Sequence, residues 1–200
     1  MKKQFVTILA ATSLSLSLCA CMTTTALTHD QRPKNWGNPI PLSNNFYQID
    51  QDLFRSEQPS FVLLPHIQQK QIGVVINLRT RDRDKKLLQD YPEIQTVHIP
   101  IRTWAIDRDD LLSIMQHIQI AKKQNKKVLI HCYHGSDRTG ASIAMYRIIF
   151  QNWTIEEAVK EMKHGGYGFH SIWSNIDAIF SPENVKWIRE QLSNPSIKPI

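Results

Sequence analysis

The sequence predicts an α/β fold in which a central, mostly parallel sheet is flanked by helices. Two observations predict it. Residues 74–78 and 127–131 are short apolar runs rich in Val, Leu and Ile, the composition of strands buried on both faces. Residues 110–124 instead place apolar side chains three or four positions apart, the period of an amphipathic helix. Strands that alternate with helices along a chain favour parallel pairing, with the helices on the faces of the sheet.

The composition is typical of one globular domain. Of the 200 residues, 42% are hydrophobic and 21% are charged, which is enough apolar material for one continuous core. The formal net charge of +6 suits an anionic substrate. No basic cluster interleaved with aromatic residues is present, so the sequence does not indicate a nucleic-acid partner.

The N-terminus has the pattern of an export signal. A lysine pair precedes the uncharged run 5–20, so residues 1–20 are predicted to be a signal peptide. The run ends in Leu-Cys-Ala-Cys, which resembles the bacterial lipobox. This resemblance implies that Cys21 becomes a lipidated N-terminal residue in the periplasm, and Met22 after it implies the outer membrane. The alternative is a plain signal peptide that is cut nearby.

Cysteine use adds a second clue. Removal of residues 1–20 and lipidation of Cys21 leave Cys132 as the only thiol of the mature chain. The predicted compartment favours disulfides, yet this cysteine has no partner. A role as a nucleophile is one explanation for such a lone thiol.

Residues 21–44 are rich in Thr, Asn and Pro and have no period, so they are predicted to form a tether between membrane and domain. The domain itself is predicted to span residues 45–200. It opens with a predicted pair of short strands at 46–49 and 53–55.

Ser60 is predicted to cap a helix across 61–71, in spite of Pro65 in its first turns. The charged stretch 79–86 opens onto a short helix, and 96–99 is predicted to be the next strand. In the C-terminal part, a Thr-x-x-Glu capping box precedes one helix and Ser-Pro-Glu another. The helices predicted there are 141–150, 154–163 and 181–191.

The most informative segment, 128–140, is an apolar strand that runs into a short loop and then into a helix. Its centre is Cys132, five residues, and Arg138. The N-terminus of a helix carries unpaired backbone N–H groups and a partial positive charge, so a loop wrapped onto it can hold a phosphate dianion. The residues predicted to bind phosphate are Tyr133, His134, Gly135, Ser136, Asp137 and Arg138.

Each residue type in this loop suits that chemistry. Gly135 allows backbone conformations and a close approach that a Cβ would hinder. Arg138 is a planar, permanently charged fork that can grip two phosphate oxygens. The same positive field favours the thiolate of Cys132, which would attack phosphorus and form a cysteinyl-phosphate that water hydrolyses. The alternative makes Cys132 a small core residue and Arg138 a surface charge.

The string H-C-Y-H-G-S-D-R-T-G resembles the cysteine-based protein tyrosine phosphatases of the dual-specificity-like type, and within them an exported bacterial branch. The resemblance spans about residues 45–168. It implies a phosphorylated protein as substrate, with phosphotyrosine favoured. It also implies that Thr139 hydrogen-bonds the departing thiolate and that His131 helps to hold the cysteine. No cofactor is implied, and no His, Cys and Asp cluster shows the spacing of metal ligands.

The general acid is the weakest point of the resemblance. Family members carry an aspartic acid in a loop that here corresponds to 100–110, but it would align near Trp104 or Ala105, where this chain has no carboxylate. Asp107 is therefore predicted as the acid, and Asp109 as the cap of the following helix. The alternative is that Asp107 is itself the cap and that the acid is absent or elsewhere.

Other residues near the motif are open to two interpretations. Asp137 is predicted to point outward and bond a neighbouring loop. The run 165–170 is either a pocket lining or a helix stop, and the arginines at 79, 81 and 83 either face substrate or form a solvated surface. The competing functions are a phosphoinositide or inositol phosphate phosphatase, and a weakly catalytic, membrane-tethered phosphate-binding module.

Overall fold

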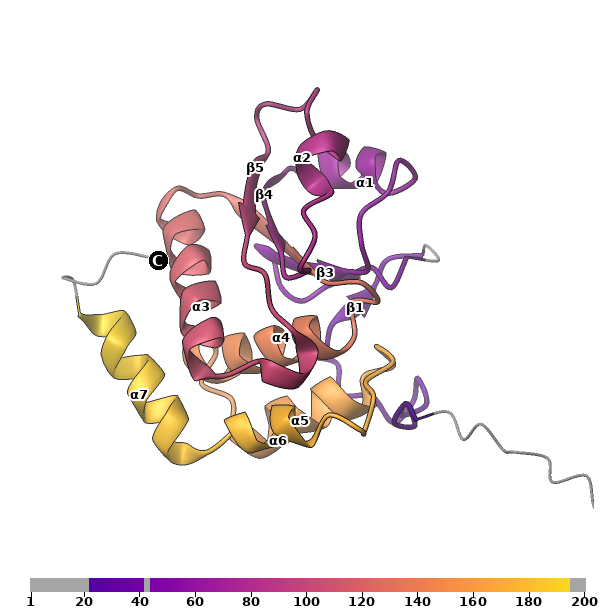
Figure 1. Cartoon of the computed structure of the whole chain (residues 1–200). Helices are drawn as coiled ribbons and strands as arrows, with labels where there is room; N and C mark the ends of the chain where they lie inside the picture. Colours follow the sequence, from indigo (N-terminus) through magenta and orange to yellow (C-terminus); the bar gives the residue numbers. More distant parts are fainter. Residues whose placement is uncertain (1–21, 42–43, 195–200) are drawn as a thin grey trace, which may run out of the picture.

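The computed structural model describes residues 22–41 and 44–194 (Figure 1). Its sheet has the strand order β1-β2-β3-β6-β4-β5. Strands β3, β6, β4 and β5 pair in parallel, whereas β1 and β2 extend the sheet antiparallel to β3. The predicted α/β fold with a central, mostly parallel sheet is confirmed. The strands are Asn38–Pro39 (β1), Tyr47–Gln48 (β2), Leu53–Ser56 (β3), Ile72–Asn77 (β4), Gln95–His98 (β5) and Lys127–His131 (β6).

Helices cover both faces of this sheet (Figure 1). Within β4, Val74 and Ile76 belong to the core under α3, α4 and α7, whereas Val75 belongs to the core under α1 and α2. This alternation explains why the strand is apolar at successive positions. The helices are α1 (Leu64–Gln69), α2 (Asp84–Leu87), the 3₁₀ turn η1 (Thr103–Ala105), α3 (Arg108–Lys123), α4 (Asp137–Phe150), α5 (Ile155–His164), α6 (Ser174–Ile179) and α7 (Pro182–Ser193).

Three helix starts differ from the prediction. Helix α4 begins at Asp137, four residues before the predicted start at 141. Helix α1 begins at Leu64, because Pro65 has no N–H and fits only the first turn. In the turn that leads into α1, the backbone N–H groups donate to the Ser60 carbonyl and not to its hydroxyl. The N-cap of α3 is Asp107, and the prediction that Asp109 caps this helix is wrong.

The capping box before α5 and the Ser181 cap of α7 are confirmed. In each case the cap hydroxyl accepts a backbone N–H from the first turn, which satisfies one of the four unpaired donors at a helix start. Helix α6 was not predicted. Within residues 22–41 and 44–194, no helix combines the length and the apolar character needed to cross a membrane.

The segment predicted to be a tether packs against the domain over its described part, 22–41, which corrects the predicted boundary at residue 45. Trp36 is buried, β1 joins the sheet, and Thr24 donates its N–H to the Phe169 carbonyl at 2.7 Å. These contacts depend on the tertiary fold, which composition does not reveal. The predicted signal peptide and Cys21 lie outside the described residues.

Candidate active site

The loop predicted to bind phosphate joins the end of β6 to the start of α4, and we call residues 132–138 the phosphate loop. Cys132 is the first residue after β6 and is only 2% exposed. Gly135 has a φ of +72°, and a Cβ on it would lie 2.4 Å from the Ser56 carbonyl oxygen. Glycine is therefore required, because the neighbouring strand β3 lies directly against the loop.

Arg138 and Thr139 lie in the first turn of α4. The Nη1 of Arg138 donates to the carbonyls of Leu78 (3.1 Å) and Ile101 (3.0 Å), which lie just after β4 and β5. Its Nε and the hydroxyl of Thr139 are buried and have no hydrogen-bond partner within the described part of the chain. Buried donors without partners are costly, so this pair is suited to an acceptor that enters the loop.

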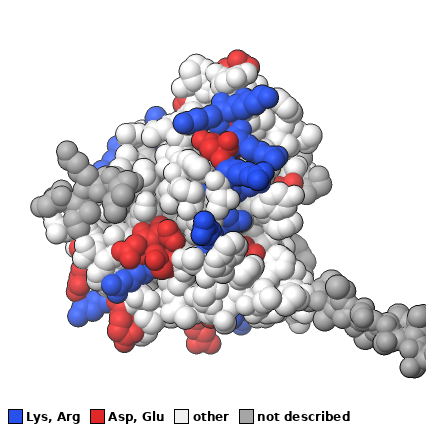
Figure 2. Space-filling model, in the orientation of Figure 1, with Lys and Arg blue, Asp and Glu red and all other residues white. Residues whose placement is uncertain are grey.

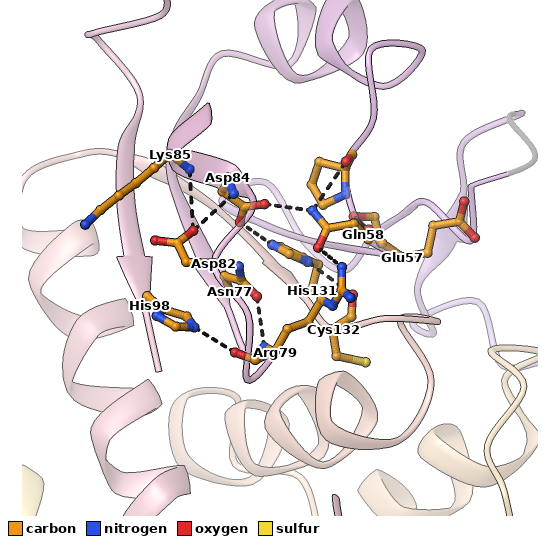
Figure 3. A network of polar contacts seen from close by, with 12 residues as sticks. Glu57, Gln58, Asn77, Arg79, Asp82, Asp84, Lys85, His98, His131 and Cys132 are labelled. Carbon is orange, nitrogen blue, oxygen red and sulfur yellow. Dashed lines mark hydrogen bonds and ion pairs between the residues drawn. The ribbon is translucent and has the colours of Figure 1, made fainter. Parts of the chain in front are cut away.

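A network of polar side chains supports the phosphate loop from behind (Figure 3). The Nε2 of His131 lies 2.6 Å from the carboxylate of Asp84, whose other oxygen accepts from Gln58 at 2.7 Å. Gln58 in turn accepts from Arg79 at 2.7 Å. This network fixes the imidazole next to Cys132 and leads from the buried loop to the basic surface.

Sequence reasoning missed Asp84. It stands in the charged stretch 79–86, where a carboxylate is ordinarily solvated, but the structure buries it completely. The only local signal is the apolar strand that precedes this stretch, since charged residues at the carboxyl end of a buried parallel strand often reach a site.

We expect Asp84→Asn to lower the free energy of unfolding by about 1.5–3 kcal/mol at neutral pH, the value of a hydrogen bond to a charged group. Burial raises the pKa of Asp84, but the hydrogen bond from His131, the charge of His131 and the bond from Gln58 outweigh it, so the net pKa lies below its usual range. A depressed carboxyl pKa gives stability that is present above the unfolded value of about 3.9 and is lost as pH falls through the folded one.

Denaturant unfolding of wild type and Asp84→Asn at pH 7 and at about pH 3 measures this effect. The difference in the free energy of unfolding between the two proteins should shrink at the acidic pH, because wild-type Asp84 is then becoming protonated. If that difference is the same at both pH values, the charge of Asp84 beside His131 does not contribute to stability.

The loop 165–170 holds the other side of the phosphate loop. The Asp137 carboxylate accepts from the His170 backbone N–H at 2.8 Å and lies 2.9 Å from the His170 ring Nδ1. Ser136 donates its hydroxyl to the Tyr167 carbonyl at 2.7 Å. The prediction that Asp137 points outward to a neighbouring loop is confirmed, and this contact explains how a carboxylate is tolerated beside Arg138.

Tyr133 and His134 form the outer rim of the loop. Their rings meet edge to face with centroids 4.6 Å apart, and the Tyr133 side chain is 55% exposed. The guanidinium of Arg79 lies 4.9 Å from the centre of the Tyr133 ring. Figure 2 shows Lys and Arg side chains gathered on the upper part of this face. The rim therefore offers a flat aromatic surface next to positive charge.

Asp107 is the N-cap residue of α3. One carboxylate oxygen accepts the N–H groups of Asp109 (2.9 Å) and Asp110 (3.0 Å), while Asp110 reaches back to the Asp107 N–H. This is a complete capping box. The alternative interpretation, in which Asp107 is the cap of the helix, accounts for its geometry.

We expect Asp107→Asn to change kcat on an aryl phosphate by less than about threefold and to keep the fold, because asparagine caps helices as well as aspartate does. Rates measured across pH on wild type and variant check this. Loss of the alkaline limb of the profile in the variant would restore Asp107 as the proton donor.

Comparison with known proteins agrees with this geometry. Residues 53–170 match the family model "Dual specificity phosphatase, catalytic domain". The dual specificity protein phosphatase TpbA of Pseudomonas aeruginosa is 30% identical over 174 residues, which cover 87% of this chain and 78% of that protein.

Solved structures show the same relationship. The crystal structure of P. aeruginosa TpbA superposes with a TM-score of 0.74 at 29% identity and covers 82% of this chain and 99% of that one. A cysteine-to-serine variant of TpbA in complex with pTyr matches equally well. The crystal structure of DUSP15, at 12% identity and a TM-score of 0.60, covers 78% of this chain and 98% of its own, and shares the fold. The chain therefore belongs to the dual-specificity phosphatase family.

Proposed function

We propose that this phosphatase hydrolyses phosphotyrosine in proteins through a cysteinyl-phosphate on Cys132, with Arg138 as the phosphate-binding side chain. The observation that carries the proposal is the pair of buried, unpartnered donors, Arg138 Nε and Thr139 Oγ1, beside the buried thiol at the start of α4. The Cys132 sulfur forms a bond to phosphorus as the bond to the tyrosine oxygen breaks. Water then displaces the sulfur and releases phosphate.

The leaving group decides between phosphotyrosine and phosphoserine. Residues 100–106 contain no carboxylate, and Asp107 is engaged as a helix cap. A tyrosine phenol has a pKa of about 10 and departs as an anion with little help, whereas the far more basic serine alkoxide needs a proton. The lack of a carboxylate at 100–106 and the capping role of Asp107 therefore favour aryl phosphates. The exposed ring of Tyr133 supplies a surface on which a phenyl group can stack.

The relatives support this substrate class. The name of the P. aeruginosa protein states dual specificity, and its cysteine-to-serine variant was crystallised with pTyr. Arg79, with Arg83 and Arg138 in electrostatic range of it, also suits a phosphorylated protein, whose phosphate and acidic residues carry negative charge.

Hydrolysis of one peptide in two versions, with phosphotyrosine or with phosphoserine, tests the proposal. The assay contains a chelator, since the proposed mechanism uses no metal. We expect kcat/KM for the phosphotyrosine version to exceed the other by more than about a hundredfold, the rate contribution of an absent general acid. Equal rates would overturn the preference. Phosphate binding without turnover of either peptide would establish the binding-module alternative.

We also propose that the mature protein is a periplasmic lipoprotein of the outer membrane, anchored through Cys21. The Leu-Cys-Ala-Cys pattern and the basic, then apolar, residues before it support this. Met22 accepts the backbone N–H of Ser171 at 2.8 Å, next to the loop that holds Asp137. A lipid on the preceding residue would thus keep the active site near the membrane surface.

Membrane fractionation of cells that express wild type or Cys21→Ala tests the anchor. Wild type should sediment with the outer membrane and carry a labelled fatty acid, whereas the variant should appear in the soluble periplasmic fraction or remain unprocessed. Cys19→Ala is the matched control and should behave like wild type. A Cys21→Ala protein that still carries the label would refute the anchor assignment.

A further inference from the structure

Arg55 is a buried arginine that lies directly behind the phosphate loop. It belongs to β3, and its side chain has no exposed surface. Its Nη2 donates to the carbonyl of Gly135 and, at 3.4 Å, to that of Ser136. The Cζ of its guanidinium also lies over the ring of Tyr167, 3.7 Å from the ring centre. The side chain thus connects the back of the loop to the aromatic residue that supports it.

Among residues 22–41 and 44–194, no carboxylate forms an ion pair with Arg55. The nearby carboxylate of Glu161 is bound at 2.7 Å by the Nε of Arg147, a second buried arginine. The Nε and Nη1 of Arg55 have no hydrogen-bond partner among the described residues. A buried, unpaired cation is among the costliest features a fold can contain, so its presence here calls for a function.

The carbonyls that Arg55 binds determine where the loop amides point. In a short loop with a left-handed glycine, a carbonyl turned to one side leaves the neighbouring N–H groups turned to the other. Arg55 holds the carbonyls of Gly135 and Ser136 at the back. The amides of the same peptide units, those of Ser136 and Asp137, are therefore held toward the front, where an oxyanion binds.

We propose that Arg55 is a positioning residue of the phosphate loop, which fixes the two carbonyls and supplies a buried positive charge that a bound phosphate dianion neutralises. This rests on the proposed function of the loop. Burying the charge of Arg55 is unfavourable in the protein without a bound anion, and the anion offsets this cost when it binds. Arg138 differs from it, because Arg138 lies at the start of α4, where its buried Nε is free to reach the phosphate itself.

Electrostatics agree with this placement. Burial lowers the pKa of Arg55, and the nearby Tyr167, Glu161 and Cys132 groups oppose that fall. The nucleophile is thus within electrostatic range of the guanidinium. Arginine stays protonated in proteins, so the charge is present at every working pH.

The experiment compares wild type with Arg55→Met and Arg55→Lys, and uses Arg147→Lys as the matched control at the other buried arginine. Three quantities are measured on the full domain: the thermal midpoint without ligand, the dissociation constant of orthovanadate, and kcat/KM on an aryl phosphate. Methionine preserves length and removes the charge. Lysine keeps the charge but can hold only one carbonyl well.

We expect Arg55→Met to weaken vanadate binding and to lower kcat/KM by about 10- to 100-fold, the usual effect of losing a group that orients a site. Its thermal midpoint without ligand should stay near or above that of wild type, because a costly buried charge has been removed. The vanadate affinity and kcat/KM of Arg55→Lys should lie between those of wild type and those of Arg55→Met. Arg147→Lys should lower the midpoint and leave vanadate affinity within about threefold of wild type, since Arg147 makes no contact with the phosphate loop.

A folded Arg55→Met protein with wild-type vanadate affinity would overturn the proposal. If that variant does not fold, Arg55→Lys decides, and wild-type affinity and kcat/KM in it would also overturn the proposal. Vanadate binding separates this outcome from failure of the proposed function. A wild-type protein that binds vanadate without turning over substrate would refute the enzyme and leave the role of Arg55 measurable.

Discussion

Cys132→Ser is expected to lose all measurable turnover while it still binds phosphate. A serine hydroxyl is protonated at every relevant pH, and no base contacts this position within the described part of the chain that could activate it. The His131 ring is engaged by Asp84 and by the Cys132 carbonyl. Loss of a nucleophile typically costs about 10⁴- to 10⁶-fold in kcat. Phosphate binding should survive, because its donors are backbone amides, Arg138 and Thr139.

Three measurements check this expectation. Aryl phosphate hydrolysis gives the loss of rate, vanadate or phosphate binding shows that the loop is intact, and thermal unfolding shows that the fold is unchanged. Intact mass spectrometry of wild type quenched in acid during turnover should find one phosphate, and none in the variant. Residual activity in Cys132→Ser that depends on Arg138 would require a different nucleophile, with water as the first candidate.

The sequence predicts the phosphate loop well because everything that defines it is contiguous. An apolar strand, a short loop with one glycine and a helix start follow one another within 128–140, and the structure reproduces that order. The helix caps at Thr154 and Ser181 are local for the same reason. Local patterns need no knowledge of the tertiary fold.

The support behind the loop could not be predicted, because it comes from residues far apart in sequence. Asp84 contacts His131 across 47 positions, and Arg55 contacts Gly135 across 80. In sequence, one stands in a charged stretch and the other ends a short strand, so both look like surface residues. Only the parallel pairing of β3 and β4 with β6 brings them to the back of the loop.

The ambiguity at Asp107 has a related cause. A helix cap and a general acid are both single aspartates in a loop before a helix, and the sequence pattern is the same for each. The reciprocal bonds with Asp110 show the cap, because one carboxylate oxygen of Asp107 accepts the backbone amides of the first turn. Composition likewise indicated a tether at 21–44, but within it residues 22–27 form backbone hydrogen bonds with residues 164–171.

Arg138→Lys is expected to lower kcat/KM by about 10²- to 10⁴-fold, although it preserves the charge. The Nη1 of Arg138 donates to the carbonyls of Leu78 and Ile101, so the other nitrogens of the guanidinium are the ones that can bind phosphate. A lysine has one ammonium, which cannot hold both carbonyls and also grip two phosphate oxygens. If the lysine turns to the phosphate, the carbonyls of Leu78 and Ile101 lose their shared donor.

Because Arg138 binds both the two carbonyls and the phosphate, the variant should lose both stability and activity. The free energy of unfolding should fall by about 1–3 kcal/mol for the carbonyls left without a partner, and the KM for aryl phosphate should rise as kcat falls. Arg79→Lys is the matched control, because the Arg79 guanidinium lies beside the loop, over the Tyr133 ring, and donates a hydrogen bond to the Gln58 side chain. It should cost less than about tenfold in kcat/KM. Equal losses of kcat/KM in Arg138→Lys and Arg79→Lys would contradict this prediction. They would mean that the site needs positive charge in general and does not depend on the planar guanidinium of Arg138.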